Sequence, residues 1–295
     1  MFGKRFRGMA CGIAAAVCYG MNPLGATALY AGGLTPDSAL FYRYGFAALL
    51  LGVGVAASGE GFRLTRREVG VLASLGALFA VSSLTFFESF RVMDTGLACT
   101  VLFVYPLMVA GVMTAFFGER LTWAMGTALA LALGGIALLC KGGDGGVSVL
   151  GVTLVLVSAL TYALYIVVVN RAAPRASAAK LTFYVMLFCL PLVLAHEALA
   201  GQALPQPLTT LPMFLWALML AVVPTVLSLV LMAMAVRLVG STPTAVMGAL
   251  EPLTAVALGV ALLGEALTPR LCVGIALILA AVTLITLAGA KPARA

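Results

Sequence analysis

Apolar stretches of about 20 residues recur along almost the whole chain, and this recurrence limits the possible folds more than any other feature. Each stretch is long enough for an α-helix to cross about 30 Å of hydrocarbon. Stretches such as 150–169 lack the alternation of apolar and polar residues that a membrane β-barrel requires. Because 63% of the residues are hydrophobic and 9% are charged, the chain also has too little polar surface for a water-soluble globule. The sequence therefore predicts an all-α polytopic membrane protein.

Polar residues and Gly or Pro interruptions divide the apolar stretches into ten predicted transmembrane helices. They lie at about 8–30, 36–57, 68–90, 95–117, 122–140, 148–170, 178–199, 212–236, 242–263 and 268–289. Basic residues precede the first stretch, as in a signal peptide. We nevertheless expect this stretch to be retained, because it is as long as a span and has a counterpart in the second half of the chain.

One block of the sequence occurs twice. The segment YPLMVAGVMTAFFGERLT at 105–122 matches EPLTAVALGVALLGEALT at 251–268, at an offset of 146 residues and without a gap. Chance rarely aligns Pro, Gly, Glu and Thr at one offset. The sequence therefore predicts a tandem duplication, with a first five-helix repeat at 1–143 and a second at 144–295. The glycine-rich KGGDGG at 141–146 suits a linker between the two copies.

The Lys and Arg residues are strongly biased to one predicted side of the membrane. Three of them, Arg91, Lys141 and Arg270, lie on the other side. Thirteen lie on the favoured side: Lys4, Arg5, Arg7, Arg63, Arg66, Arg67, Arg120, Arg171, Arg175, Lys180, Arg237, Lys291 and Arg294. This bias places both termini in the cytoplasm. Because each copy has an odd number of helices, the second copy must be inverted, and inverted repeats are a recurrent plan of secondary transporters.

Both copies of the duplicated block end in Gly-Glu-x-Leu-Thr, a sequence that predicts a tight hairpin between two spans. The glycines suit left-handed C-caps and the threonines suit N-caps. We interpret the glutamates as hairpin carboxylates at the membrane surface in preference to functional groups. The residues concerned are Gly118, Glu119 and Thr122 in the first copy and Gly264, Glu265 and Thr268 in the second.

Pro23, Pro106 and Pro252 lie inside predicted helices, and Pro191 and Pro224 give further possible kinks without a chemical partner. Each should kink its helix, which is tolerated in a membrane where the freed backbone faces protein or a wet cavity. Glu251 precedes Pro252, and burying it charged and unpaired would be costly. We interpret it either as a proton or substrate-amine site, or as a protonated group satisfied by the kinked backbone.

Arg43 lies inside the second predicted helix, about 10 Å from its outer end. The favoured interpretation is a structural ion pair with Glu88, and the alternative is contact with a substrate carboxylate in a wet cavity. Polar and aromatic residues at helical spacing suit the wall of such a cavity, although each taken singly is also a common packing residue. The predicted cavity residues are Tyr19, Asn22, Arg43, Phe79, Ser82, Ser83, Tyr105, Tyr162, Tyr165, Met247 and Glu251.

The duplicated Pro-Leu and Gly-Glu-x-Leu-Thr, with Glu-Pro in the second copy and an Arg in the second helix, resemble the EamA family of the drug/metabolite transporter superfamily. The resemblance extends over about residues 8–289. It implies ten helices in two inverted five-helix repeats, a central cavity, and export of small metabolites such as amino acids. Overall likeness, without a diagnostic motif, favours the YddG type of amino-acid exporter. Tyr105 before the first proline and Pro269-Arg270 after the second hairpin depart from the commoner pattern, and neither indicates the substrate.

We therefore expect a bacterial inner-membrane carrier that exports amino acids or similar small metabolites by alternating access and works as a monomer in the lipid bilayer. Proton-coupled and downhill transport are both compatible with the sequence. The alternative is efflux of lipophilic cations, with Glu251 as the counter-charge.

Other classes of function have weaker support in the sequence. The basic residues form no single patch for nucleic acid, and the six cysteines lack metal-type spacing. The chain also lacks HExxH, GxSxG and paired aspartates in one helix, so we expect no metal, cofactor or enzymatic activity. The single histidine, His196, is expected to be a solvated loop residue.

Overall fold

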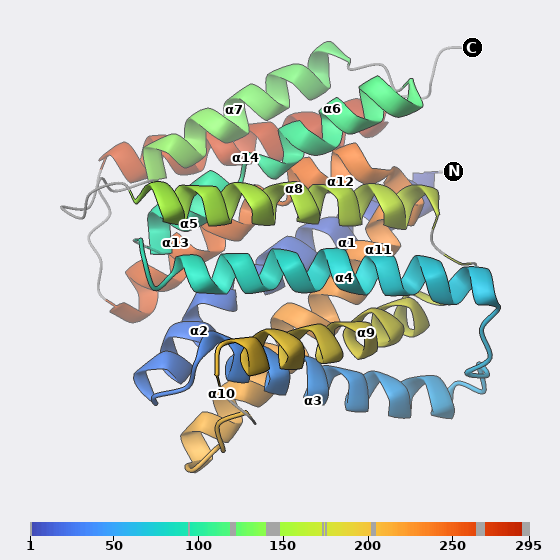
Figure 1. Cartoon of the computed structure of the whole chain (residues 1–295). Helices are drawn as coiled ribbons and strands as arrows, with labels where there is room; N and C mark the ends of the chain where they lie inside the picture. The colour runs from blue at the N-terminus through green and yellow to red at the C-terminus, as the bar shows by residue number, and fades with distance from the viewer. Residues whose placement is uncertain are drawn as a thin grey trace.

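The computed structural model describes residues 2–93, 95–118, 122–139, 148–172, 174, 176–201, 205–263 and 269–290. All regular secondary structure within these ranges is helical, as the sequence predicts (Figure 1). Among the described residues, six helical stretches are long and apolar enough to cross a membrane: Gly3–Ala31, Pro36–Ala57, Arg66–Ser89, Val149–Arg171, Ala178–Leu199 and Leu211–Val239. Shorter apolar helices lie at Tyr105–Phe117, Trp123–Leu138 and Cys272–Leu284.

Several helices run through their predicted ranges without a break. They are α3 (Pro36–Ala57), α4 (Arg66–Ser89), α7 (Trp123–Leu139), α8 (Val149–Arg171), α9 (Ala178–Leu199) and α14 (Pro269–Ala290). Side-chain oxygens fix where some of them begin. Thr35 Oγ1 accepts a hydrogen bond from the backbone N–H of Ser38 at the start of α3, and Thr65 forms a capping box with Glu68 at the start of α4.

Three of the predicted helices are each split into two pieces. The pieces are α1 (Phe2–Tyr19) with α2 (Asn22–Ala31), α5 (Thr95–Leu102) with α6 (Tyr105–Phe117), and α12 (Ser241–Met247) with α13 (Leu250–Leu263). Pro23, Pro106 and Pro252 each lie in the first turn of the second piece. Proline is accommodated there because a first-turn N–H has no acceptor within the helix. The chain therefore turns at 20–21, 103–104 and 248–249.

The helix predicted at 212–236 has a different irregularity. It comprises α10 (Leu211–Ala221), a π-helical turn η1 (Val222–Leu227) and α11 (Ser228–Val239). Pro224 lies in the π-helical turn, and the Thr225 hydroxyl donates to the carbonyl of Leu220 at 2.7 Å. Such turns are frequent at functional sites in helical proteins.

The helix packing follows the two copies of the sequence. The pair α1 with α11 becomes the pair α8 with α4 when each helix is exchanged for its counterpart in the other copy, and both pairs pack along their length. Two further pairs, α3 with α9 and α7 with α14, join counterparts directly, and α6 packs on α12, which belongs to the split helix that corresponds to α5 and α6. Figure 1 shows α4 beside α8 across the middle, with α3 and α9 below and α7 and α14 above. This is the packing that a two-fold relation between the halves would produce.

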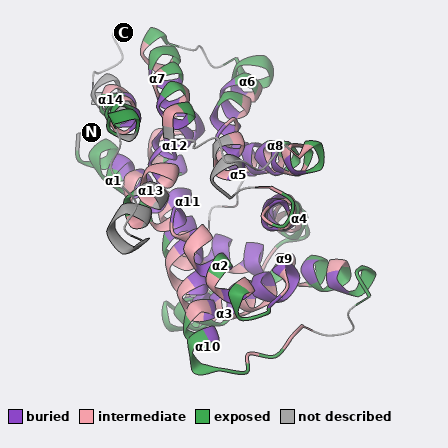
Figure 2. Cartoon of the chain, turned by 90° about the vertical axis from the view of Figure 1, so that its left-hand side faces the viewer, coloured by how far each residue is buried: buried purple, intermediate pink, exposed green. Residues whose placement is uncertain are grey.

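Large apolar side chains cover the outside of the helix bundle. Trp123 is 93% exposed, Phe116 is 77% exposed and Val53 is 70% exposed. Figure 2 shows exposed residues in green on the outward sides of α6, α7 and α10, and buried residues in purple in α11 and α12. Apolar exposure on this scale marks a surface that contacts lipid.

The first of the two predicted hairpins is partly described. Gly118 ends α6 with a φ of +65°, which confirms the predicted left-handed C-cap. Thr122 accepts a hydrogen bond from the backbone N–H of Met125 at 3.3 Å, which confirms the predicted N-cap. Other predictions lie outside the described residues: Glu119, the second hairpin at 264–268 and the linker at 141–146.

Candidate functional site

Tyr105 and Glu251, the first residues of the two copies of the duplicated block, contact each other. Tyr105 begins α6, and Glu251 is the second residue of α13. The Tyr105 hydroxyl oxygen lies 3.4 Å from Glu251 Oε1 and 3.3 Å from the carbonyl oxygen of Ala245. Its single proton can be donated to only one of these acceptors at a time. Because the two residues are 146 positions apart, which is the offset of the repeat, a two-fold axis relating the halves would pass between them.

Two cavities adjoin at Glu251. The first has a cavity volume of about 20 Å³ and the second of about 10 Å³, which is room for about one water molecule each. The first, here named the Tyr19 cavity, is lined by residues that include Tyr19, Asn22, Pro23, Phe86, Leu102, Glu251 and Pro252. The second, here named the Tyr162 cavity, is lined by residues that include Tyr105, Tyr162, Ile166, Ser228, Met232, Gly248 and Glu251.

The linings of the two cavities are related by the repeat. At an offset of 143 residues in the first helix of each copy, Tyr19 corresponds to Tyr162 and Pro23 to Ile166. At an offset of 146 the further corresponding pairs are Phe86 with Met232, Leu102 with Gly248, and Tyr105 with Glu251. Each half of the molecule therefore supplies equivalent positions to opposite cavities.

Aromatic rings connect the two cavities. Tyr162 stacks on Tyr19 with ring centroids 5.9 Å apart, and its edge-to-face contact with Tyr105 has a centroid distance of 4.9 Å. Tyr165 stacks on Tyr162 at 6.2 Å, and Phe79 lies 5.2 Å from Tyr165. These five rings, all in the predicted cavity set, form one buried cluster from α1, α4, α6 and α8.

Arg43 of α3 is fully buried beside this cluster. Its Nε donates to Thr225 Oγ1 in the π-helical turn at 2.6 Å. The guanidinium carbon lies 5.8 Å from the ring centroid of Tyr19, 5.6 Å from that of Tyr44 and 5.7 Å from that of Phe87, which are cation–π distances. Its two terminal nitrogens have no hydrogen-bond partner among the described residues.

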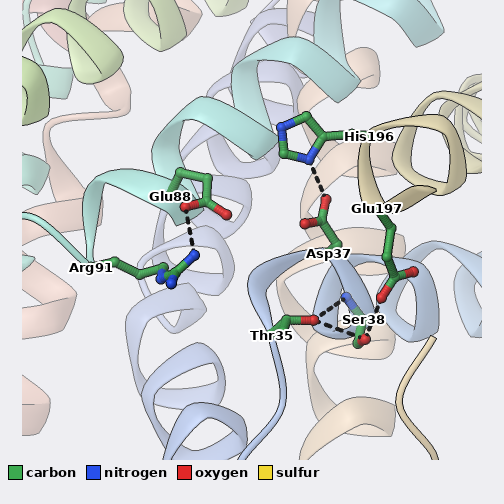
Figure 3. A network of polar contacts seen from close by, with 7 residues as sticks. All are labelled: Thr35, Asp37, Ser38, Glu88, Arg91, His196 and Glu197. Carbon is green, nitrogen blue, oxygen red and sulfur yellow. Dashed lines mark hydrogen bonds and ion pairs between the residues drawn. The ribbon is translucent and has the colours of Figure 1, made fainter. Parts of the chain in front are cut away.

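The favoured ion pair between Arg43 and Glu88 is not formed. Glu88 Oε2 instead accepts from Arg91 Nη1 at 3.3 Å (Figure 3). Arg91 follows Glu88 by three residues at the end of α4 and is 62% exposed, so it pairs with Glu88 without being buried. The side chain of Arg43 points toward Thr225 and aromatic rings. The predicted ion pair rested on the depth of the two residues in the membrane, and depth does not determine the direction in which a side chain leaves its helix.

Asn22 also has unsatisfied polar atoms. It lines the Tyr19 cavity and is only 1% exposed, and neither atom of its amide has a hydrogen-bond partner among the described residues. A buried amide without partners is energetically unfavourable. Asn22 is therefore suited to a water molecule or a polar solute in the cavity.

Six predicted cavity residues line neither of these two cavities. Arg43, Phe79 and Tyr165 lie in or beside the aromatic cluster, and helix packing places Ser82, Ser83 and Met247. The Ser158 hydroxyl donates to the carbonyl of Ser82 at 2.7 Å and so joins α8 to α4. Ser83 is buried in α4 without a hydrogen-bond partner among the described residues. Met247 is fully buried, and its sulfur would lie 2.9 Å from a Cβ added at Gly12, so it packs against α1.

A second polar cluster joins the start of α3 to the end of α9 (Figure 3). His196 Nδ1 lies 2.7 Å from Asp37 Oδ1, and the Ser38 hydroxyl donates to Glu197 Oε1 at 2.7 Å. His196 is thus a residue of α9 paired with a carboxylate and not a loop residue as predicted, although its side chain is 44% exposed. The apolar run before it continues as a helix to Leu199, so His196 lies on that helix.

The roles of Thr225 and Gly248 were not predicted from the sequence. Thr225 follows Pro224, a proline within an apolar stretch, which is a signal for an irregular helix. Gly248 lies four residues before Pro252, where a helix break is expected, but its contact with Tyr105 depends on how the two halves pack together.

Comparison with known proteins supports the two-copy organisation. Residues 6–140 and 149–287 each match the EamA-like transporter family. A similar relative is an uncharacterized transporter of Archaeoglobus fulgidus, 27% identical over 220 residues, which are 73% of this chain and 77% of the relative. A solved crystal structure has the same fold with a TM-score of 0.81 at 20% identity, covering 95% of this chain and 98% of its own.

One family match lies in each half of the chain, and together the two matches cover most of it. They confirm the resemblance to the EamA family that the sequence motifs indicate. The chain therefore belongs to the EamA-like transporter family and is a multi-pass membrane transporter of small molecules.

Proposed function

We propose that the protein is a secondary carrier that exports amino acids or similar small metabolites by alternating access. The observation that carries this proposal is the pair of cavities, lined by corresponding positions of the two copies, that adjoin at Glu251. In an inverted repeat the halves can exchange conformations, so that one cavity opens while its counterpart closes. Transport then follows from the symmetry of the fold and requires no second subunit.

The proposed topology has ten transmembrane helices in two inverted repeats, 1–143 and 144–295. Both termini face the cytoplasm and the host membrane is a bacterial inner membrane. The excess of Lys and Arg on one side supports this orientation. Figure 1 supports it as well, because α1 begins and α14 ends on the same side of the bundle.

The charges around Tyr19 favour a zwitterionic solute. Tyr19 and the half-buried Glu251 line the Tyr19 cavity, and Arg43 lies against the ring of Tyr19. A carboxylate suits a substrate ammonium group, whereas a guanidinium with two unpartnered nitrogens suits a substrate carboxylate. The aromatic rings between these charges offer an apolar surface for a side chain.

The second candidate function is efflux of lipophilic cations. Glu251 among aromatic rings favours it, because such rings and a carboxylate attract cations. The buried guanidinium of Arg43 disfavours it, because like charges repel in a low-dielectric interior. A substrate screen separates the two candidates.

The decisive experiment is a counterflow screen with reconstituted protein. Proteoliposomes are loaded with unlabelled amino acids, quaternary ammonium cations or nucleosides, and entry of the labelled compound is followed. Accelerated exchange of an amino acid is expected. Exchange of cations alone would favour the second candidate, and no exchange of any amino acid would contradict the proposal.

A further inference from the structure

We infer that Tyr105 is the gate between the Tyr19 cavity and the Tyr162 cavity, and that Gly248 provides the space in which this gate closes. The inference rests on the proposed alternating access and assigns its central barrier to one side chain. Glu251 lines both cavities, and Tyr105 lines the Tyr162 cavity while contacting Glu251. The phenol of Tyr105 therefore occupies the boundary that a solute must cross.

The closed position of Tyr105 is held from several sides. Its ring lies 4.9 Å from that of Tyr162 and 5.5 Å from that of Phe103, and only 2% of the residue is exposed. Its hydroxyl has two acceptors at nearly equal distances, Glu251 Oε1 and the carbonyl oxygen of Ala245. The hydroxyl can therefore release Glu251 to a solute or a proton and still keep a hydrogen-bond acceptor. Binding of a solute or a proton to Glu251 therefore changes which hydrogen bond holds Tyr105 in its closed position.

Gly248 is required by space and not by its backbone conformation. Its φ of −56° is open to any residue, but a Cβ added there would overlap the Tyr105 hydroxyl and lie 3.0 Å from Tyr105 Cζ. The counterpart of Gly248 in the first copy is Leu102. The long side chain of Tyr105 is thus matched by a glycine. In the corresponding pair, the shorter Glu251 and Leu102 line the Tyr19 cavity together. The gate is therefore a feature of one half only.

In the proposed alternating access, each face of the membrane reaches a different cavity. Phe86 lies near the end of α4 and lines the Tyr19 cavity, whereas its counterpart Met232 lies in α11 and lines the Tyr162 cavity. A thiol at either position reports whether a membrane-impermeant methanethiosulfonate reagent reaches that cavity from a chosen face. This measurement needs no transported substrate.

The test uses full-length protein in which the six native cysteines are replaced by alanine or serine and one thiol is introduced by Phe86→Cys or Met232→Cys. Right-side-out and inside-out vesicles are treated with the reagent. With Tyr105 intact, each thiol is expected to react from one face only, and the two thiols from opposite faces. Gly248→Ala should displace Tyr105 and make both thiols reactive from both faces. Tyr105→Phe, which keeps the ring, should raise reaction from the far face about fivefold, the effect of one lost hydrogen bond.

Gly111→Ala is the matched control, because Gly111 lies in α6 with Tyr105 and an added Cβ there has nothing within 4 Å. It should leave the reaction one-sided. In a Tyr105→Ala background, which already lacks the gate, Gly248→Ala should change nothing further. Should Gly248→Ala alone fail to fold, recovery of folded protein in the double variant would establish the contact, and Tyr105→Ala then tests the gate by itself.

One-sided reaction in the Gly248→Ala and Tyr105→Ala variants would overturn the gate, whatever the protein transports. Conversely, loss of one-sidedness in these variants together with a negative counterflow screen would support the gate and contradict the proposed substrate class. The two proposals therefore fail in distinguishable ways.

Discussion

Arg43 of α3 donates through Nε to Thr225 Oγ1 at 2.6 Å, which ties the first half of the molecule to the π-helical turn of the second half. Thr225 also donates to the carbonyl of Leu220, so its hydroxyl both donates and accepts a hydrogen bond. Both residues are completely buried. The irregular turn thus has a physical role, because it presents a hydroxyl to a buried guanidinium whose terminal nitrogens stay available.

Thr225→Val is expected to destabilise the protein. Valine has nearly the same shape but leaves a third nitrogen of Arg43 without an acceptor, at a cost of about 1–3 kcal/mol in the free energy of unfolding. The measurement is thermal unfolding in detergent. Thr153→Val is the control, because Thr153 is exposed on α8 and donates only to Val149 of its own helix. Equal stability of the two variants would contradict the role given to Thr225.

Arg43→Gln tests the substrate side of the same residue. We expect it to abolish counterflow of carboxylate-bearing solutes, because an uncharged amide replaces the guanidinium that is proposed to pair with the substrate carboxylate. Arg91→Gln, which removes an exposed arginine paired with Glu88, should transport normally. Normal transport by folded Arg43→Gln protein would show that the guanidinium serves structure alone.

Glu251→Gln tests proton coupling. Glutamine keeps an acceptor for the Tyr105 hydroxyl but cannot exchange a proton. If Glu251 carries the proton, the variant should still exchange substrate in counterflow and lose acceleration by an imposed pH gradient. Glu88→Gln serves as the control, since its carboxylate pairs with Arg91 at the surface. Unchanged transport with unchanged pH dependence would exclude Glu251 as the proton carrier.

The positions of the helices were predictable, whereas their mutual contacts were not. Apolar length gave the helix ranges, and Pro23, Pro106 and Pro252 marked where the chain turns. The repeat showed that Tyr105 and Glu251 correspond, but only the docking of the two halves brings their side chains within 3.4 Å.

The prediction of an ion pair between Arg43 and Glu88 was wrong for the same reason, because contacts between helices depend on how the helices pack. Arg43 and Glu88 were paired on depth alone, and depth leaves open the direction in which a side chain leaves its helix. The π-helical turn that orients Thr225 toward Arg43 is likewise set by tertiary packing, and Pro224 gave only the hint of an irregularity.

The contact between Glu60 and Ser177, outside the transmembrane helices, is expected to be sensitive to acid. The hydroxyl and the backbone N–H of Ser177 lower the pKa of Glu60 below its ordinary value of 4.5, and the N–H lies 2.9 Å from Oε1. A carboxyl group whose pKa is lowered by folding stabilises the folded state at a pH above its ordinary pKa. This contribution is lost as the pH falls through the pKa of the group in the folded protein. Glu60→Gln should therefore reduce the Tm difference between neutral pH and a pH well below 4.5. An unchanged difference would contradict the contact.

The hydrogen bonds between Ser82 and Ser158 are expected to couple α4 and α8 energetically. Each serine is buried, and their hydroxyls lie 3.1 Å apart while Ser158 donates to the Ser82 carbonyl. Hydrogen bonds between transmembrane helices contribute about 0.6 kcal/mol on average. A double-mutant cycle of Ser82→Ala and Ser158→Ala should give a coupling energy of this size. Additive effects would indicate that the serines are only small packing residues.

The hydrogen bond from Ser38 to Glu197 is expected to stabilise the folded protein. Glu197 is 2% exposed; its Oε1 accepts from the Ser38 hydroxyl, while Oε2 has no partner among the described residues. Ser38→Ala removes the donor to a nearly buried carboxyl group, so we expect it to lower the free energy of unfolding by about 1–3 kcal/mol. Ser74→Ala, on the exposed face of α4, should have little effect. The loss of stability is expected to arise from the uncompensated carboxyl group. Glu197→Gln, whose amide carries its own donors, should therefore recover part of that loss in the Ser38→Ala background. If it does not, the loss comes instead from the hydrogen bond that Ser38 Oγ accepts from the backbone N–H of Gln206.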